Sequence, residues 1–391
     1  MSPTIIQLKQ VPRYFVLMLL LFSAAGCHKT NGEDEQKPSY NPTPYVFTQT
    51  FPNYVPPAQL YIPADNPETM EGVKLGRFLF YDSILSSDYH HACSSCHQQA
   101  YAFTDRHRPL STGVGDSLGT FNSMALFNIL WERGGFFWNA RAPILDSQIV
   151  GPVPNTKEMN LPWPKAVARL QASTMYPDLF KKAFGSSVVT KENTVKAIAQ
   201  FLRTIVSYNS KFDSVQQGLA TFTPSENIGY ILFTQDPTVN TPNHQVSSVP
   251  LGHRVPGTGL DCFHCHAVPD FIPELNLSNS QVLLNNGFGT INLKVPSLRN
   301  LKFSAPYMSD GSVATLDSVI AHYDHEVDPK DPSVSNLMYA KKYTGPNAAA
   351  ELATPHMELS AEEKAGLIDF LNTLNDYSLL TNPAYSNPFL H

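Results

Sequence analysis

Two five-residue stretches, "CSSCH" at Cys93–His97 and "CFHCH" at Cys262–His266, decide how this 391-residue sequence is interpreted. They contain four of the five cysteines in the chain, and the fifth is Cys27 near the N-terminus. In both stretches a histidine follows the second cysteine directly. Since no further cysteine exists, the sequence indicates no disulfide framework.

Cys-x-x-Cys-His is the attachment signature of c-type haem. Two thiols on one helical turn can add to the two vinyl groups, and the adjacent histidine then lies below the iron as its proximal ligand. A zinc site would need further ligands close by, and a redox-active cysteine pair would not explain the histidine in both copies. We therefore predict two covalently bound haem c groups, held by Cys93, Cys96, His97, Cys262, Cys265 and His266.

The sequence around these motifs is duplicated. Cys93 and Cys262 are 169 residues apart (262 − 93 = 169), and "AIAQFLRTI" from Ala197 is repeated as "GLIDFLNTL" from Gly366 at the same offset (366 − 197 = 169). Upstream of the motifs the offset is smaller, as in the "LF" pairs at Leu79 and Leu232 (232 − 79 = 153). The second copy therefore has extra residues before its motif (169 − 153 = 16).

The fold class follows from the hydrophobic pattern. Apolar residues recur every three or four positions in "NTVKAIAQFLRTIVSY" and "SAEEKAGLIDFLNTL", whereas almost no segment alternates with period two. The hydrophobic content of 42% is sufficient for real cores. We predict a mainly α chain with two tandem cytochrome c-like domains, an N-terminal haem domain at 61–222 and a C-terminal haem domain at 223–380, and then a tail at 381–391.

The N-terminus is typical of an export signal, with a short basic region, an apolar run at residues 14–22 and small residues before Cys27. That run is too short to span a bilayer. We predict a signal peptide at 1–26 and a lipid on Cys27, because "SAAGC" is similar to a bacterial lipobox, although Ala24 stands where leucine is usual. Plain cleavage is the alternative. The polar, proline-rich segment 27–60 is predicted to be a flexible tether, and the exported protein to lie in the periplasm or cell envelope.

The net charge of the chain argues against nucleic acid as a partner. The formal charge is −6, and removal of the signal peptide with its two cations makes it −8 (25 − 33 = −8). A mildly acidic chain without a basic run has no electrostatic attraction to nucleic acid.

Between Gly72 and Leu374 the chain resembles the bacterial dihaem cytochrome c peroxidase and MauG family. Besides both haem motifs, the resemblance rests on motifs in a fixed order: "STGVGDSLGTFNS", "FFWNARA", "GPVPNTKEMN", "VPSLRNL" and "APYMSDGSVATLDSVIAHY". It implies that the N-terminal haem reacts with hydrogen peroxide and that the C-terminal haem stores and relays an electron. It also implies a small donor protein, either a cytochrome c or a copper protein.

The loop after the first motif bears on the sixth coordination position of the first iron. Many of these peroxidases have "STGHG", in which the histidine caps the iron, but this sequence has Val114 there. Valine cannot bind iron, so the resemblance implies an open, constitutively accessible first haem, as in MauG. His107, His90 and His91 are the rival ligands.

Catalytic roles also follow from the resemblance. Glu158 in "TKEMN" matches the catalytic glutamate, which moves a proton between the peroxide oxygens, and Gln148 matches its companion. Burial would raise the pKa of Glu158 and suit this role, whereas the alternative is an ordinary exposed carboxylate. Trp138 in "FFWNARA" matches the tryptophan between the haems, and a core aromatic residue is its alternative.

Ligands of the second iron and of the haem propionates complete the predicted set. Tyr323 in "IAHYDH" matches the axial tyrosine of MauG, where peroxidases have methionine, and it would lower the haem potential. Met308 and His322 are its rivals. Arg299 in "SLRN" and Arg141 are expected to pair with propionates, with a surface salt bridge as the alternative.

The resemblance further implies a calcium ion between the domains. Its matching ligands are the Asn122 side chain and the backbone carbonyls of Ser304 and Pro306, which are oxygen ligands of the kind that Ca²⁺ prefers.

Three functions stay open. The first is a dihaem peroxidase, an oxidoreductase of the cytochrome-c peroxidase type (EC 1.11.1.5) that reduces hydrogen peroxide to water. The second is a MauG-like oxidase that acts on a protein or a small molecule. The third is a dihaem electron carrier without a substrate, which would have both irons capped on both sides.

Overall fold

The structure, a computed structural model, describes residues 40–47, 51–52, 54–55, 60–105, 107–132, 135–235, 257–260, 262–269, 283–284, 292–327, 357 and 359–390. The predicted signal peptide, Cys27 and the first part of the predicted tether lie outside these residues. The same is true of residues 236–256, where most of the extra length of the second copy falls.

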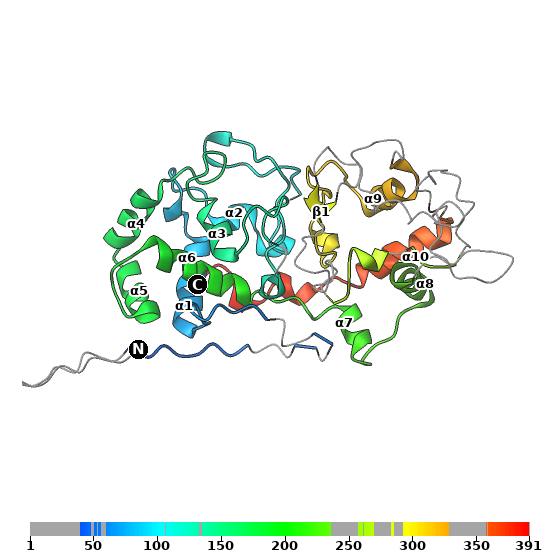
Figure 1. Ribbon diagram of the computed structural model, residues 1–391, viewed down its shortest axis with the longest axis horizontal. Helices are drawn as coiled ribbons and strands as arrows, with labels where there is room; N and C mark the ends of the chain where they lie inside the picture. The colour runs from blue at the N-terminus through cyan, green and yellow to red at the C-terminus, as the bar shows by residue number, and fades with distance from the viewer. Residues whose placement is uncertain are drawn as a thin grey trace, which may run out of the picture. The chain divides into compact units, whose positions relative to one another are not determined.

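Helices dominate the described residues, in agreement with the predicted mainly α class (Figure 1). They are α1 (Met70–Tyr81), α2 (Cys93–Cys96), α3 (Leu145–Val150), α4 (Trp163–Ala172), α5 (Tyr176–Phe184), α6 (Lys191–Thr204), α7 (Lys211–Gln216), α8 (Pro224–Thr234), α9 (Leu316–Ala321) and α10 (Ala361–Asn372). The short strands β1 (Leu283–Leu284) and β2 (Leu293–Lys294) pair in antiparallel fashion.

Single turns supply the rest of the regular structure. The 3₁₀ turns are Ser83–Leu85, Gln99–Tyr101, Val114–Asp116, Ile129–Trp131, Cys262–His264, Leu301–Phe303, Tyr377–Leu380 and Pro383–Tyr385, and His322–Glu326 is a π-helical turn. Within the described part of the chain, none of the helices has both the length and the apolar character needed to cross a membrane.

Helices α1 and α6 form the first close helix pair. The side chain of Thr69 caps α1 by accepting a hydrogen bond from the Gly72 backbone N–H, which satisfies one of the free donors of the first turn. A Cβ at Gly76 would lie 1.9 Å from the carbonyl oxygen of Ala197 in α6. Only glycine therefore allows the two backbones to approach so closely.

Helices α8 and α10 repeat this arrangement in the second half of the chain. A Cβ at Gly229 would lie 2.0 Å from the carbonyl oxygen of Gly366. Gly229 follows Gly76 by 153 residues (229 − 76 = 153), and Gly366 follows Ala197 by 169 (366 − 197 = 169). The helix contact is thus repeated at the two offsets seen in the sequence.

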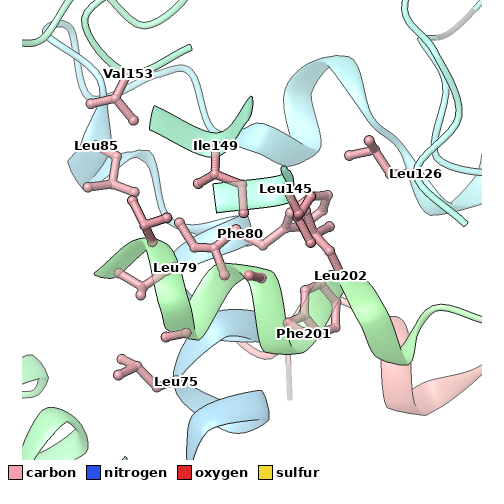
Figure 2. Close-up of a cluster of buried hydrophobic side chains, with 14 of the residues drawn as sticks. Leu75, Leu79, Phe80, Leu85, Leu126, Leu145, Ile149, Val153, Phe201 and Leu202 are labelled. Carbon is pink, nitrogen blue, oxygen red and sulfur yellow. The ribbon is translucent and has the colours of Figure 1, made fainter. Parts of the chain in front are cut away.

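Each helix pair has its own hydrophobic core. The first joins α1, α3 and α6 and is shown in Figure 2, with Leu75, Leu79, Phe80, Leu145, Ile149 and Phe201 among its members. The second contains Phe212, Leu232, Phe233, Leu367, Phe370 and Leu374. Burial of each such leucine or phenylalanine contributes about 1.5–3 kcal/mol, so both cores are substantial.

Residues from two of the predicted segments pack in cores outside those segments. Phe212 lies in the predicted N-terminal domain but belongs to the second core, which therefore extends back to α7. Tyr385 is buried in the first core, and Arg77 donates to the Ser386 carbonyl at 2.7 Å. The predicted tail therefore packs against the N-terminal half, because its aromatic residue completes that core.

The described part of the predicted tether also belongs to the folded body. The backbone N–H and the hydroxyl of Thr43 both donate to the Glu71 carboxylate at 2.9 Å, and the Tyr45 N–H donates to the Glu68 carbonyl at 3.0 Å. Val55 is only 1% exposed. Aromatic and apolar side chains in this segment supply contacts that a flexible tether would lack.

Candidate functional site

A cavity of about 1170 Å³ brings the two cysteine motifs together. Its wall includes both cysteines and the histidine of each motif. The rest of the wall comes from both halves of the chain and contains most of the predicted site residues: Glu158, Gln148, Trp138, Arg299, Tyr323, Asn122, Ser304 and Pro306.

The first motif forms the short helix α2, which places Cys93 and Cys96 on one turn. His97 ends this helix, and its backbone N–H donates to the Cys93 carbonyl at 3.0 Å. Its ring Nδ1 lies 3.1 Å from the Phe103 carbonyl oxygen and 3.2 Å from the Ser123 hydroxyl. Histidines that bind a metal usually donate their other ring nitrogen in this way, so His97 is oriented as a proximal ligand.

Burial lowers the pKa of His97, although the Phe103 carbonyl and Asp105 act in the opposite direction. The imidazole is therefore neutral near pH 7, as iron binding requires.

None of the four motif cysteines forms a disulfide. Burial raises the pKa of Cys93 to about 12, that of Cys96 to about 11 and that of Cys262 to about 12. Zinc sites and reactive cysteine pairs use thiolates. Among the described residues, moreover, no three His, Cys, Asp or Glu side chains form a cluster that could hold a metal ion. Two cysteines on one helical turn, the oriented His97 ring and the large cavity that all three line fit a c-type haem.

The second motif has a similar local geometry. Residues Cys262–His264 form a 3₁₀ turn, and the His266 backbone N–H donates to the Cys262 carbonyl at 2.9 Å. This contact matches the one between His97 and Cys93 in the first motif.

Glu158 and Gln148 reach the cavity from adjacent elements. Gln148 lies on α3, and Glu158 lies in the turns that follow. The Asn155 side chain donates to Glu158 Oε1 at 2.6 Å and orients the carboxylate. Burial raises the pKa of Glu158, and this effect outweighs the opposing ones of Asn155 and Arg141. A carboxyl group with a raised pKa can both accept and return a proton near neutrality.

Val114 lies in a hairpin beside Glu158, but its side chain is not part of the cavity wall. The backbone supplies the contact instead, because the Val114 N–H donates to the Glu158 carbonyl at 2.8 Å. Gly113, directly before it, does line the cavity.

The rival histidines differ in their surroundings. His107 is exposed, and its Nδ1 lies 3.0 Å from the Ala305 carbonyl oxygen. His90 is exposed, whereas His91 lines the cavity with its Nδ1 2.7 Å from an Asp88 carboxylate oxygen. Of these three, only His91 faces the cavity.

Tyr323 lies in the π-helical turn and forms part of the cavity wall. Its rival His322 is buried but does not line the cavity, whereas Met308 does. Met357 also reaches the wall and was not expected from the sequence. The only sequence signal for it is its place just before the predicted closing helix.

Trp138 is held from both halves of the chain. Its indole N–H donates to the Asn122 carbonyl at 2.8 Å, and its own carbonyl accepts from the Lys294 N–H at 2.6 Å. The Lys294 ammonium pairs with Glu132 at 2.6 Å. Both partners of this ion pair line the cavity, and sequence reasoning missed them because neither belongs to a motif.

The three expected calcium ligands lie in the same cavity wall. The Asn122 side-chain N–H₂ donates to the carbonyls of Arg108 and Pro109 at 3.1 Å each. The Ser304 hydroxyl donates to the Leu301 carbonyl at 3.3 Å. These contacts occupy the donors of Asn122 and do not use its amide oxygen.

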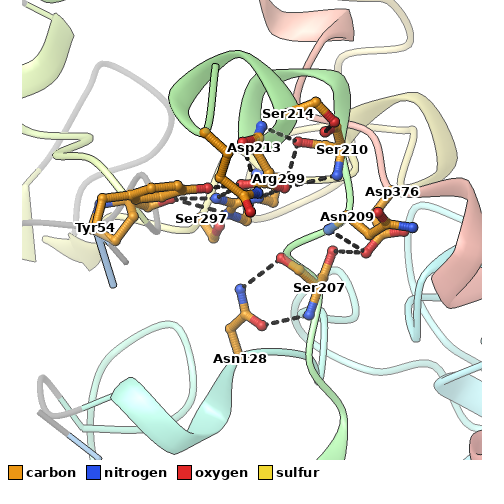
Figure 3. A network of polar contacts seen from close by, with 12 residues as sticks. Tyr54, Asn128, Ser207, Asn209, Ser210, Asp213, Ser214, Ser297, Arg299 and Asp376 are labelled. Carbon is orange, nitrogen blue, oxygen red and sulfur yellow. Dashed lines mark hydrogen bonds and ion pairs between the residues drawn. The ribbon is translucent and has the colours of Figure 1, made fainter. Parts of the chain in front are cut away.

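Arg299, which lines the cavity, is held by a network of polar contacts (Figure 3). Its guanidinium binds the Asp213 carboxylate with two hydrogen bonds of 2.8 and 3.1 Å, and it also donates to the Pro269 carbonyl. Its side chain is fully buried and lies over the Tyr208 ring. This salt bridge with a carboxylate of α7 is buried, unlike the surface salt bridge that was the alternative, and pairing of Arg299 with a propionate stays a prediction.

Arg141 is exposed, and its guanidinium stacks on the Phe137 ring at 3.6 Å. It also donates to the Asn139 side chain at 3.1 Å.

Comparison with known proteins agrees with this arrangement. The family model of the di-haem cytochrome c peroxidases matches residues 70–221. The chain is 30% identical over 263 residues to cytochrome c551 peroxidase from Nitrosomonas europaea, covering 66% of this chain and 74% of that protein. It is 29% identical over 326 residues to methylamine utilization protein MauG from Methylophilus methylotrophus, covering 83% and 88%.

A crystal structure of a MauG-like protein associated with microbial copper homeostasis superposes with a TM-score of 0.70 at 29% identity, covering 88% of this chain and all of that one. The chain belongs to the dihaem cytochrome c peroxidase and MauG family. This confirms the resemblance seen in the sequence, and membership implies haem c cofactors.

Proposed function

We propose that this chain reduces hydrogen peroxide to water with electrons from a small donor protein. The observation that carries the proposal is the position of Glu158, a carboxyl group with a raised pKa, in the wall of the cavity that also contains His97. Peroxidase relatives support it, because cytochrome c551 peroxidase is among the similar proteins.

Two haem groups would be held by thioether bonds to Cys93 and Cys96 and to Cys262 and Cys265, with His97 and His266 as proximal ligands. When bound, the haem iron supplies the centre that binds peroxide and the electrons that reduce it. Two electrons and two protons convert one peroxide molecule into two of water.

Glu158 moves the proton in this reaction. It would accept a proton from one peroxide oxygen and deliver it to the other, which leaves as water. The hydrogen bond from Asn155 holds the carboxylate in one orientation, so little reorganisation is needed during the transfer. Gln148, on the same wall, orients the peroxide.

Trp138 shares the cavity wall with both motifs and is the proposed route for an electron between the haem groups. The hydrogen bond from its indole N–H to the Asn122 carbonyl and the one from the Lys294 N–H to its backbone carbonyl hold Trp138 in place, which favours a constant transfer distance.

The first iron is proposed to stay open in the oxidised protein, because Val114 replaces the histidine of the capping loop. Val114→His tests this. The variant adds an imidazole beside Gly113 at the cavity wall, and the oxidised spectrum should change from partly high-spin to wholly six-coordinate low-spin. Val114→Ala is the control and should keep the high-spin signal. A wild-type protein that is wholly low-spin would contradict the open site.

A MauG-like oxidase is the second candidate, and Tyr323 is the observation that favours it. Tyr323, in the same cavity wall as the second motif, would be a ligand of the second haem, and its phenolate would lower the haem potential relative to methionine. Steady-state reduction of peroxide with reduced cytochrome c separates the two candidates. Measurable turnover supports the peroxidase, and negligible turnover supports the oxidase.

Two further proposals rest on the sequence. The protein would be exported and anchored to a membrane in the cell envelope through a lipid on Cys27. A calcium ion would be bound by Asn122, Ser304 and Pro306, which share the cavity wall.

A further inference from the structure

We propose that the hairpin of residues 111–119 is a fixed brace for Glu158, and that Gly113 is the positioning residue through which it acts. The inference rests on the proposed function, in which Glu158 transfers the proton.

The hairpin is closed by its own backbone. The Gly113 N–H donates to the Ser117 carbonyl at 2.8 Å, and the Gly119 N–H donates to the Ser111 carbonyl at 2.9 Å. Gly115 at its tip has a φ of +67°, which glycine adopts without strain. The loop therefore has a defined backbone structure and can act as a rigid support for the residues that it contacts.

The brace touches the segment of Glu158 at two points. One is the hydrogen bond from the Val114 N–H to the Glu158 carbonyl. The other is steric: a Cβ at Gly113 would lie 2.2 Å from the Lys157 carbonyl oxygen and 2.7 Å from the Glu158 Cα. No real Cβ lies so close to backbone atoms.

Backbone conformation does not explain the glycine at 113. Its φ of −101° and ψ of −165° are in the extended region that any residue can adopt. Glycine is needed there only because the backbone of Lys157 and Glu158 occupies the space of a side chain.

The segment on the other side of the contact is also held. The Glu158 N–H donates to the Asn155 carbonyl at 3.0 Å, and the Ser87 N–H donates to the Met159 carbonyl at 2.9 Å. Since the backbone is fixed on both sides of Glu158, pressure from the hairpin must either move the carboxylate or open the hairpin.

Catalytic groups tolerate little displacement. A shift of about 1 Å can reduce a rate about 10²-fold, and productive positioning requires about 0.5 Å. To relieve a contact of 2.2 Å, a methyl group at Gly113 would have to displace the neighbouring backbone by a distance of this size. The brace therefore determines whether Glu158 can reach the peroxide.

The test compares Gly113→Ala with Gly119→Ala in the oxidised holoprotein. Gly119 belongs to the same hairpin, but a Cβ there would lie 3.4 Å from its nearest neighbour, the Ser111 carbonyl oxygen. Haem content and melting temperature check that both variants are folded. Two rates are measured: peroxide reduction and cyanide association. Hydrogen cyanide must lose its proton to a base when it binds, so the second rate reports on Glu158 without turnover.

In Gly113→Ala both rates should fall about 10²-fold, and amide exchange at residues 111–119 should become faster. In Gly119→Ala both rates should stay near the wild-type values. Equal behaviour of the two variants would overturn the brace. If Gly113→Ala does not bind haem, residue-resolved amide hydrogen exchange is measured in the wild type. Protection of the Val114 amide supports the brace, and exchange of this amide at the rate of an unprotected amide overturns it.

Glu158→Gln separates this inference from the proposed function. If that variant loses both rates while Gly113→Ala keeps them, the brace is wrong and the role of Glu158 stands. If Glu158→Gln keeps both rates, the role of Glu158 itself is wrong.

Discussion

Glu158 links the chemistry of the cavity to the stability of the fold. Burial raises the pKa of its carboxyl group, so the folded protein holds that proton more tightly than the unfolded chain does. The stability from this proton is fully present below the ordinary glutamate pKa and is lost as pH rises through the raised value. Ionised Glu158 therefore destabilises the folded protein near neutral pH.

Glu158→Gln removes that ionisation. We expect a higher melting temperature than in the wild type at pH 7, and we expect the gain to vanish near pH 4, where both side chains are neutral. Thermal unfolding of both proteins across this range checks the sign. A gain that is the same at pH 4 and pH 7 would show that ionisation of Glu158 is not involved.

Single residues of the site were predictable where a motif carries them. Glu158, Gln148 and Trp138 were found by motif register, and the structure places all three in one wall. The Lys294–Glu132 ion pair and Met357 were missed. The position of each of these residues depends on segments that are far apart in the sequence and come together only in the folded protein. No local sequence pattern indicates such contacts.

At the scale of elements, the two glycines at the helix crossings are the most specific feature. A methyl group at Gly76 or Gly229 would meet a carbonyl oxygen of the partner helix at 1.9 or 2.0 Å. Overpacking of this kind typically costs about 1–3 kcal/mol.

We therefore expect Gly76→Ala and Gly229→Ala each to lower the midpoint of denaturant-induced unfolding. Lys74→Ala is the matched control, because Lys74 is an exposed position on the same helix as Gly76. An unchanged midpoint in the glycine variants would mean that the helices can move apart without a loss of folding stability.

Helices with a clear hydrophobic period were predictable from the sequence. Residues 197–205 lie in or directly after α6, and residues 366–374 overlap α10, as their 3.6-residue pattern indicates. The segment at 40–47 was not predictable, because its polar, proline-rich sequence has no period. Its structure comes from hydrogen bonds to α1 and the residues before it, which only the fold supplies.

At the scale of the whole molecule, a buried polar network joins the two cores. Arg299 pairs with Asp213 on α7, and nearby Ser207 and Asn209, between α6 and α7, both donate to Asp376 after α10 (Figure 3). Burial alone would raise the pKa of Asp213, but Arg299 outweighs it, with help from Ser210 and Tyr54, and the pKa is lowered. The stability from this carboxylate is thus present above the ordinary aspartate pKa and is lost as pH falls through the lowered value.

Asp213→Asn leaves the Arg299 charge buried without a counterion. We expect a loss of about 3–5 kcal/mol in the free energy of unfolding at pH 7, with a smaller loss in acid. Asp178→Asn is the control, because its pair with Lys182 is more than half exposed and contributes little. Equal stability of the two variants at pH 7 would contradict a role for Asp213 in joining the halves.

The most direct test of the central claim is the initial rate of peroxide reduction by the fully oxidised holoprotein, with reduced cytochrome c as donor and without prior reduction of the enzyme. The proposed open first iron and proton transfer by Glu158 predict turnover without a lag, reduced about 10²–10⁴-fold in Glu158→Gln. No turnover by the wild type, or equal turnover by the variant, would contradict the account.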